Sequence, residues 1–312
     1  MSSIILVLGS INIDLTVTAD EIPKVGETVI GKSFNQYPGG KGANQAVCAA
    51  KLRSAVCFLG KVGKDAYGDF MLKEMSSSGV DVSHIERSET STGIAAISVD
   101  SKGQNNIIVV PGANFDVDSA YIDRHKNAID KCGIIMAQHE TPVETTEYAF
   151  KIAKAFNKTT ILNPAPAQII SEAMISVTDI LVPNEHELSR ITGLPCKSTG
   201  DIAEAARVLQ SKGVKFIIVT MGKEGVMLLD GEGERIFPAF RVNPVDTTAA
   251  GDSFLGGFAA SYAKNSDMAA AIVYGQIAAS YAIQYKGAQS SMPSYEQFEA
   301  YQKTIEERQY AG

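Results

Sequence analysis

The arrangement of hydrophobic and polar positions divides the chain into two parts of different character. From about residue 130 onward, short aliphatic and β-branched runs alternate with longer stretches of helical periodicity. The apolar runs are GIIMAQ, TTILNPAP, TDILVPN and FIIVTMG, and the helical stretches are VETTEYAFKIAKAF, NEHELSRITG and DIAEAARVLQSKG. Strands that alternate with helices build a parallel sheet with helices on both faces. The pattern predicts an α/β fold with a doubly wound, mostly parallel sheet flanked by helices.

The amino-terminal third contains more strand-like than helical segments. After a first apolar strand, IILVLGS, the segments LTVTAD, ETVIGKSF, GIAAISVD and NNIIVVPG all have the character of extended chain. We expect them to form a small antiparallel flap, or lid, from about residues 13–38 and 93–111. No repeat, low-complexity tract or linker divides the sequence, so a single α/β domain is expected over residues 1–312.

The stretch GETVIGKS, residues 26–33, matches the letters of a phosphate-binding P-loop, G-x-x-x-x-G-K-[ST]. That motif needs an apolar strand before the loop and a helix that begins at its Lys-Ser. Here Pro23 interrupts a polar stretch on one side, and Pro38 followed by two glycines prevents a helix on the other. We therefore interpret GETVIGKS as one strand of the flap and expect any phosphate site elsewhere.

Composition and charge favour a small-molecule partner. The chain has 312 residues, of which 45% are hydrophobic, so it can bury a substantial core. Its formal net charge is −7, and no cluster of Lys and Arg is present. Binding to nucleic acid needs concentrated positive charge, so the sequence argues against a nucleic-acid surface.

No secretory or membrane segment is indicated. The amino-terminal MSSIILVLGS has too short an apolar run and too little basic charge for a signal peptide, and residues 268–283 are typical of a buried helix. The four cysteines lack C-x-x-C spacing, so they suggest neither a disulfide framework nor a zinc site: Cys48, Cys57, Cys132 and Cys196. We expect a cytoplasmic protein with reduced thiols and no membrane partner.

Polar residues follow several of the predicted strands directly. They are INID after VLGS, QHE after IIMA, PNEHE after ILV, and the stretch VDTTAAGDSF. In parallel α/β sheets, ligands bind beyond the carboxyl ends of the strands. These four stretches are therefore the first candidates for a binding site.

Two stretches combine small residues with the expected start of a helix. VDTTAAGDSF places alanines and a glycine before a helix predicted over about residues 252–263, where free amides attract an anion. Asp252 is then either the N-cap of this helix or a general base beside the anion. PGGKGANQAVCAAKLR is either a tight turn into a helix from near Ala43 or a cradle in which Lys41 and Asn44 bind a polar ligand.

These motifs carry a resemblance. GGKGANQA at 39–46 and DTTAAGDSF at 246–254 resemble the two signature motifs of the PfkB carbohydrate kinase family, and NEHE between them fits that family's Asn-x-x-Glu. The resemblance continues through GSINID, GQN, PGAN, NPAP, TMGKEGV and KGAQSS, over nearly the whole chain. It implies a parallel sheet between helices with a β-flap lid, and transfer of the γ-phosphate of ATP to the 5-hydroxyl of ribose.

The resemblance also implies roles for individual residues. The sugar hydroxyls would be held by Asn12, Asp14, Gly40, Lys41, Asn44, Glu140 and Asp252. Asp252 would also accept the proton, and Ala250 and Gly251 would form the anion hole. Mg²⁺ and phosphate would be organised by Asn184 and Glu187, and the ATP nucleotide would lie along Thr220, Gly222, Gly225 and Gln276.

A monovalent cation and a second subunit are further implications of the resemblance. K⁺ as an activator would lie in a loop formed by Asp246, Thr248, Ala282, Tyr285, Gly287 and Ser291, several of them acting through backbone carbonyls. The flap would be exchanged as a clasp in a homodimer. The histidines have no role in this scheme and are interpreted as surface or structural residues: His84, His125, His139 and His186.

Other functions stay open at this point. A kinase for 2-deoxyribose or another sugar would differ only in how single hydroxyls are recognised. A non-catalytic sugar or nucleotide sensor on the same fold would not need Asp252 beside an anion hole. An NAD-dependent oxidoreductase is disfavoured, because IILVLGSIN lacks G-x-G-x-x-G after the first strand.

Overall fold

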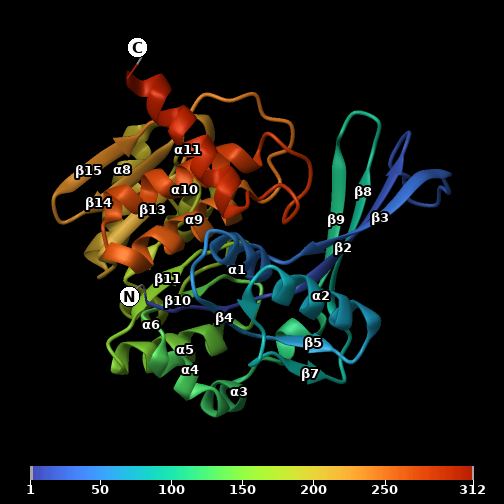
Figure 1. The fold of residues 1–312 in the computed structure, drawn as a ribbon, viewed down its shortest axis with the longest axis horizontal. Helices are drawn as coiled ribbons and strands as arrows, with labels where there is room; N and C mark the ends of the chain where they lie inside the picture. Colours follow the sequence, from blue (N-terminus) through green and yellow to red (C-terminus); the bar gives the residue numbers. More distant parts are fainter. Residues whose placement is uncertain (1–2, 311–312) are drawn as a thin grey trace.

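A nine-stranded sheet forms the centre of the molecule (Figure 1). The structure is a computed structural model that describes residues 3–310. The strand order is β15-β14-β13-β12-β11-β10-β1-β4-β6, and the strands from β13 to β6 run parallel. Their bounds are β1 Ile5–Leu8, β4 Val56–Leu59, β6 Val80–Asp81, β10 Ile134–Ala137, β11 Thr159–Leu162, β12 Ile180–Leu181, β13 Phe216–Thr220, β14 Val226–Asp230 and β15 Gly233–Phe237.

Helices cover both faces of this sheet, as the alternating pattern predicted. Their bounds are α1 Lys41–Lys51, α2 Ala66–Ser77, α3 Ser119–Arg124, α4 Lys126–Lys131, α5 Val143–Ala155, α6 Glu172–Ser176, α7 Glu185–Thr192, α8 Thr199–Ser211, α9 Ala250–Asn265, α10 Met268–Ala282 and α11 Tyr295–Tyr310. The predicted mostly parallel α/β fold is confirmed.

Side chains that alternate between the two faces of the main sheet contribute to two separate hydrophobic cores. In β1, Ile5 and Val7 pack with α1, α9 and α10, while Leu6 and Leu8 pack with α3 to α8 on the other face. Successive side chains of a strand point to opposite faces, so a strand covered on both sides reads as a continuous apolar run. This is why the sequence shows uninterrupted runs such as IILVL.

A second sheet of four strands projects from the body (Figure 1). Its order is β3-β2-β8-β9, with β2 Asn12–Ala19, β3 Gly31–Gly39, β8 Gly93–Val99 and β9 Asn105–Val110. The expectation of an antiparallel flap is wrong at one place, because β2 and β8 pair in parallel. Between them the chain crosses the body through α1, β4 and α2 and re-enters the projecting sheet in the same direction.

GETVIGKS lies at the tip of this projecting sheet. Strand β3 begins only at Gly31, so the first residues of the stretch form a turn and an exposed loop rather than a strand. Lys32 forms an exposed ion pair with Asp20. Pro38 is accommodated because β3 is an edge strand, where a missing N–H costs no ladder bond. The absence of a P-loop is confirmed for this stretch.

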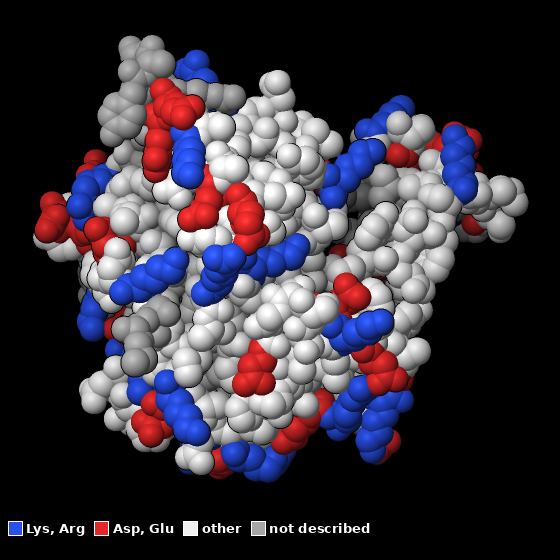
Figure 2. Space-filling view, viewed as in Figure 1, with Lys and Arg blue, Asp and Glu red and all other residues white. Residues whose placement is uncertain are grey.

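The outer strand of the projecting sheet, β9, is uncovered within the chain, whereas Ile13 of β2 and Ala95 of β8 are buried against the body. Every residue of β9 is exposed, including Ile107, Ile108, Val109 and Val110. Figure 2 shows that the length of this sheet carries few charged side chains, which gather instead at its tip. An apolar strand exposed on both faces is a candidate for contact with another chain.

The main sheet changes its direction of winding beside β1. The chain continues from β1 to β4 and β6 on one side, and later adds β10 to β13 on the other. Ligands in open α/β folds bind in the crevice at such a switch point. Helix α1 approaches β1 closely here, since a Cβ on Gly42 would lie 2.7 Å from the Cα of Gly9. Among the described residues, no helix combines the length and apolar character of a membrane span.

Candidate active site

The predicted ligand-binding residues gather beyond the carboxyl ends of the parallel strands. A cavity of about 250 Å³ lies there, bounded by α1, the segments after β11 to β13, and the start of α9. Seven of the predicted residues line this cavity: Lys41, Asn184, Glu187, Thr220, Ala250, Gly251 and Asp252. These residues are separated by up to 211 positions in the sequence and meet only because their strands end at one edge.

Helix α9 begins at the cavity with an unusual turn. Its N-cap is Ala249 in left-handed conformation, with φ 58° and no side-chain capping bond, and its first residue is Ala250. The alternative that Asp252 caps the helix is therefore wrong, because Asp252 lies inside the first turn. The left-handed conformation of a non-glycine residue such as Ala249 costs on the order of 1 kcal/mol or more. Backbone strain of this kind is often found at functional sites.

The first turn of α9 leaves amides without acceptors. Ala250 N–H donates to the carbonyl of Thr247, and Ser253 N–H donates to that of Ala249. Within residues 3–310, no acceptor is found for the N–H groups of Gly251 and Asp252. A Cβ on Gly251 would meet nothing within 4 Å, so the space above it is open. Free amides at the positive end of a 16-residue helix form a site for an anion.

The carboxylate of Asp252 is buried and held by two side-chain amides. Asn44 Nδ2 donates to Oδ2 at 2.9 Å, and Gln45 Nε2 donates to Oδ1 at 3.0 Å. Gln138 Nε2 donates to Gln45 Oε1 at 2.6 Å, and Gln289 Nε2 donates to Asn44 Oδ1 at 3.1 Å. All four amides are buried. This chain of hydrogen bonds fixes the orientation of Asp252 without a neighbouring cation in direct contact.

A second group of polar residues lies at the end of β1 and β10. Ser10 Oγ donates to Glu140 Oε2 at 2.5 Å, and Lys41 N–H donates to the same oxygen at 3.0 Å. Gly40 precedes α1 with φ 90°, and a Cβ there would lie 2.8 Å from the backbone nitrogen of Asn12. Glycine at this position therefore lets the loop approach β2 closely.

The side chain of Asn12 is hydrogen-bonded to a second asparagine, Asn114. Asn114 Nδ2 donates to Asn12 Oδ1 at 2.7 Å, and Asn114 Oδ1 accepts from Ile11 N–H at 2.8 Å. Asn114 has only 1% of its surface exposed. Its fixed orientation determines which atoms Asn12 presents toward the site.

Electrostatic interactions join the two groups. Burial, followed by the negative charges of Glu140 and Asp252, raises the pKa of Asp14 to about 6. Burial alone would lower the pKa of Lys41, but the carboxylates of Asp252, Glu140 and Glu187 raise it above its usual value. The charge of one lysine thus interacts with several carboxylates. Because carboxylates only accept hydrogen bonds, the group favours a ligand that donates many of them.

Asn184 and Glu187 form the start of α7. Asn184 Oδ1 accepts from Glu187 N–H at 2.8 Å, and Glu187 Oε2 accepts from Asn184 N–H at 2.8 Å, which is a capping box. Burial raises the pKa of Glu187 despite the bond from Asn184. Glu187 Oε1 accepts no hydrogen bond from the described residues, so it can serve a ligand at the cavity wall.

The remaining predicted nucleotide residues lie farther along the same side. Thr220 ends β13 at the cavity, and Gly222 and Gly225 flank the short turn that leads into β14. Gln276 on α10 is buried and donates to the carbonyls of Phe237 and Pro238, at 2.9 and 3.2 Å. Gly222, Gly225 and Gln276 do not line the cavity.

Three of the residues predicted to bind a monovalent cation, Asp246, Thr248 and Gly287, meet where two loops adjoin. Asp246 Oδ1 accepts from Thr248 N–H and Oδ2 accepts from Gly287 N–H, both at 2.9 Å. Ile283, next to Ala282, accepts hydrogen bonds from the backbone of Val245 and Asp246. The other members follow in the second loop, where Tyr285 is exposed and Ser291 is buried.

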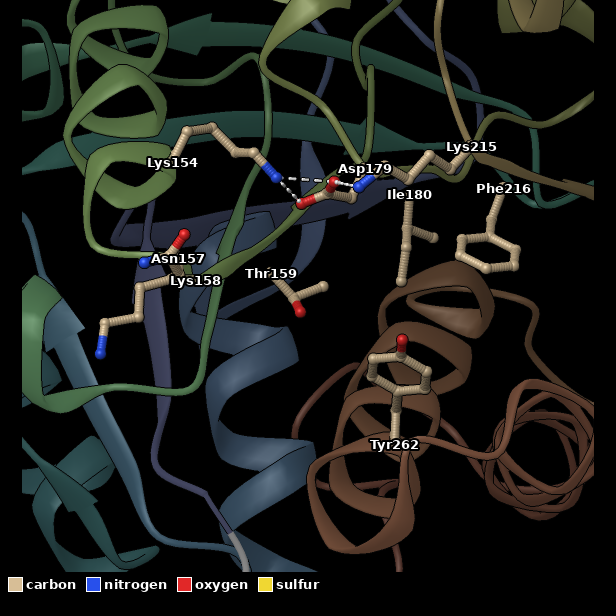
Figure 3. Close-up of a pocket in the computed structure, with 9 residues that line it drawn as sticks. All are labelled: Lys154, Asn157, Lys158, Thr159, Asp179, Ile180, Lys215, Phe216 and Tyr262. Carbon is tan, nitrogen blue, oxygen red and sulfur yellow. Dashed lines mark hydrogen bonds and ion pairs between the residues drawn. The ribbon is translucent and has the colours of Figure 1, made fainter.

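A second cavity, of about 310 Å³, lies at the opposite end of the strands, at the starts of β11, β12 and β13 (Figure 3). Lys154 and Lys215 both point to Asp179 and form ion pairs with it, at 2.6 and 2.9 Å. The single carboxylate of Asp179 balances one of the two lysine charges, and it also accepts hydrogen bonds from Thr160. Its place at the amino ends of the strands disfavours it as the active site.

The sequence did not predict the buried residues that orient the site side chains through hydrogen bonds. Gln45, Gln138, Asn114 and Gln289 are buried polar residues that touch Asp252 or Asn12 directly or through one neighbour. In the sequence, the one feature that marks them is that each is a polar residue within an apolar run or within one of the motifs described above. Which partner each one reaches depends on the tertiary structure.

Comparison with known proteins gives a consistent result. The sequence profile of the pfkB family carbohydrate kinases matches residues 3–295. A deoxyribokinase of Salmonella typhi is 41% identical over 299 residues, covering 95% of this chain and 98% of that protein. A ribokinase of Bacillus subtilis is 41% identical over 296 residues, with 95% and 98% coverage. The structure of Arabidopsis thaliana ribokinase complexed with ribose and ATP superposes with a TM-score of 0.92 at 32% identity, over 97% of this chain and 99% of that chain.

The raised pKa of Asp14 predicts a pH-dependent stability effect. A carboxyl that binds its proton more tightly when folded favours folding below its unfolded pKa, and this contribution is lost as the pH rises through about 6. Asp14→Asn should therefore raise the free energy of unfolding at pH 7.5, by at most about 3 kcal/mol, and the gain should vanish near pH 4. Urea unfolding at both pH values measures it. Asp20→Asn, at an exposed carboxylate, is the control; an equal gain in both variants would contradict the role of burial.

Proposed function

This chain belongs to the pfkB family of carbohydrate kinases, and we propose that it transfers the γ-phosphate of ATP to the 5-hydroxyl of D-ribose. The observation that carries the proposal is the buried Asp252 carboxylate in the first turn of α9, beside the free amide of Gly251. A proton acceptor and an anion site are thus within one helical turn of each other. Phosphoryl transfer needs this combination, because a hydroxyl must lose its proton while charge develops on the phosphoryl group.

In this reaction Asp252 accepts the proton of the sugar hydroxyl. Asn44 and Gln45 each donate to one of its oxygens, and each carboxylate oxygen retains a further lone pair for the hydroxyl. Because both amides are neutral donors, they orient the carboxylate without blocking its role as acceptor. Gly251 and Ala250 then present the start of α9 to the transferred phosphoryl group.

The polar group on the other side of Lys41 is proposed to hold the sugar. Asp14, Glu140 and Asn12 supply acceptors, and Lys41 supplies a donor. A ribose hydroxyl that donates to Asp14 compensates part of the cost of burying this carboxylate next to Glu140 and Asp252. Sugar affinity is thereby coupled to the ionised form of Asp14.

ATP is proposed to lie along Thr220, Gly222, Gly225 and Gln276, with its phosphates toward α9. The similarity to Arabidopsis thaliana ribokinase, whose structure is complexed with ribose and ATP, supports this pair of substrates. Mg²⁺ fits the cavity wall at Asn184 and Glu187, because Glu187 has a free carboxylate oxygen and a pKa raised by burial. When bound there, Mg²⁺ would neutralise phosphate charge.

K⁺ is proposed to bind between the loops that contain Asp246 and Gly287. Oxygen donors, including backbone carbonyls, suit such a hard cation, and Asp246 already ties the two loops together. The loop at Asp246 leads directly into the first turn of α9. A cation held here would therefore order the anion site without contacting the substrate.

The projecting sheet is proposed to act as a lid over the sugar and as the interface of a homodimer. Asn12 and Asp14 lie in β2, so the sheet extends directly from the sugar site. A second copy of the same sheet offers a matching apolar face for the uncovered residues of β9. A lid of this kind would exclude water from the transferred phosphoryl group.

2-Deoxyribose is the second candidate substrate. The deoxyribokinase of Salmonella typhi and the ribokinase of Bacillus subtilis are both 41% identical to this chain, so overall similarity does not separate the two sugars. Asp14 favours ribose, since a carboxylate can accept from two adjacent hydroxyls and deoxyribose offers only one of them.

Asp252→Asn should lower kcat by about 10²–10⁴-fold, the range for a positioned general base, because the amide cannot accept a proton. The measurement is ADP release at saturating sugar and ATP. Asp267→Asn is a matched control, because Asp267 caps the neighbouring helix α10 by accepting from Ala270 N–H. Near-normal turnover of Asp252→Asn, with an unchanged control, would remove Asp252 from the chemistry.

Ribose should exceed 2-deoxyribose in kcat/KM by at least about tenfold, and Asp14→Ala should reduce this ratio while weakening ribose binding. Initial rates for a panel of pentoses and hexoses, in K⁺ and in Na⁺, measure both the sugar preference and the cation effect. Asp20→Ala should leave the ratio unchanged, since Asp20 lies at the exposed tip of the sheet. Equal efficiencies on the unmodified enzyme would indicate a deoxyribokinase or a broad pentose kinase.

Ile108→Asp should convert a dimer into a monomer, because it places a charge on the uncovered face of β9, where Ile108 is 69% exposed. Light scattering at several protein concentrations measures the mass. Ile236→Asp is the control, because Ile236 is 50% exposed on β15 at the other end of the molecule. A fully active unmodified enzyme with the mass of one chain would contradict the dimer.

A further inference from the structure

Three side chains with metal-binding atoms meet at the edge of the main sheet, and none of them lines the cavity at α9. Cys57 Sγ, a carboxylate oxygen of Asp81 and a ring nitrogen of His84 lie within 4.8 Å of one another. Among the described residues, this is the one group of at least three such ligands at this spacing. Cys57 and Asp81 are direct partners on the parallel strands β4 and β6, so their side chains point to the same face.

The turn after β6 brings His84 back toward Cys57. Asp81 Oδ1 accepts from Ser83 N–H at 2.9 Å, and Ile85 N–H donates to the carbonyl of Val82 at 3.0 Å. The hydroxyl of Tyr121 donates to the carbonyl of His84 at 2.7 Å. The backbone that carries the ligands is thus fixed at several points before any ion binds, which reduces the entropy lost on binding.

Of the three side chains, only that of Asp81 takes part in a hydrogen bond, which it accepts from Ser83 N–H, within the described residues. The other three cysteines each donate to a backbone carbonyl: Cys48 to Ser253, Cys132 to Ile129 and Cys196 to Leu194. Within residues 3–310, neither the thiol of Cys57 nor the ring nitrogens of His84 donate to a protein acceptor. Asp81 keeps one carboxylate oxygen free of protein donors. Cys57 is 9% exposed while Asp81 is exposed, so the group opens to solvent at Asp81.

We propose that Cys57, Asp81 and His84 form a binding site for Zn²⁺, with water as the fourth ligand. Bonds of about 2.0–2.3 Å in a tetrahedron place ligand atoms roughly 3.3–3.8 Å apart. Because the three ligand atoms lie within 4.8 Å of one another, they need to approach by at most about 1.5 Å, within the reach of side-chain rotation. One sulfur, one nitrogen and one carboxylate oxygen suit zinc, whereas Mg²⁺ prefers oxygen ligands alone.

The expected consequence is stabilisation of the sheet edge. Strand β6 has only two residues and pairs with β4 through Val56 and Cys57. Binding of Zn²⁺ displaces the thiol proton to solvent and links β4, β6 and the following turn through one ion. Because the site is separate from the cavity at α9, it does not depend on the sugar or on ATP.

Co²⁺ is the probe for this site, since it occupies zinc sites and absorbs light. The unmodified, untagged protein should bind one Co²⁺ with a thiolate charge-transfer band in the near ultraviolet, and one equivalent of Zn²⁺ should remove the band. Cys57→Ser should abolish the band. His84→Ala should weaken Co²⁺ binding by more than the roughly 10-fold minimum seen on losing an outer-shell partner of a metal site. Zn²⁺ should raise the Tm of the unmodified protein but not of Cys57→Ser.

Cys196→Ser is the matched control, because Cys196 is more exposed than Cys57 and lies in a distant loop. It should retain the band and the shift in Tm. His84→Ala is at a half-buried position and keeps the test available should Cys57→Ser fail to fold. Absence of the band from the unmodified protein, its persistence in Cys57→Ser, its displacement by excess Mg²⁺, or its loss in Cys196→Ser would each overturn the proposal.

Discussion

A carboxylate buried in the first turn of a helix needs hydrogen-bond donors, and at Asp252 this requirement joins distant parts of the chain. The donors Asn44 and Gln45 come from α1, while Gln138 after β10 and Gln289 near the carboxyl terminus hold these two in place. An unpaired carboxylate at this depth would cost several kcal/mol. The position of α1 against α9, and with it one core of the molecule, is therefore linked to the orientation of a single side chain.

The polar residues proposed to hold the sugar are linked by charge and burial. Asp14, Glu140 and Asp252 share the field of Lys41, but burial, together with the charges of Glu140 and Asp252, still raises the pKa of Asp14. Buried carboxylates that repel one another in the empty site gain more binding free energy from a ligand that donates hydrogen bonds to them. The same residues that make the free protein less stable at neutral pH thus favour binding of a polyhydroxylated ligand.

The residues at the two ends of the parallel strands differ in structure. At the carboxyl ends, α9 begins with the free amides of Gly251 and Asp252, and a cavity opens above them. At the amino ends, Asp179 holds Lys154 and Lys215 and ties α5 to the starts of β12 and β13. The projecting sheet differs from both, because the apolar residues of its outer strand β9 are exposed.

The sequence by itself determined the fold class and the segments that carry the site, because the period of the apolar residues and the motifs at strand ends are local features. The alternation after residue 130 predicted the parallel sheet, and GGKGANQA and DTTAAGDSF marked the two loops that meet at the cavity. Only the tertiary structure decided that β2 and β8 pair in parallel, that Ala249 rather than Asp252 caps α9, and that Gln45 holds Asp252. The grouping of Cys57, Asp81 and His84 is of the same kind, since no spacing of these letters suggests a metal site and only the register of β4 against β6 brings the side chains together. Strand register and helix packing are set by contacts between residues far apart in the chain, and a pattern within one segment does not contain them.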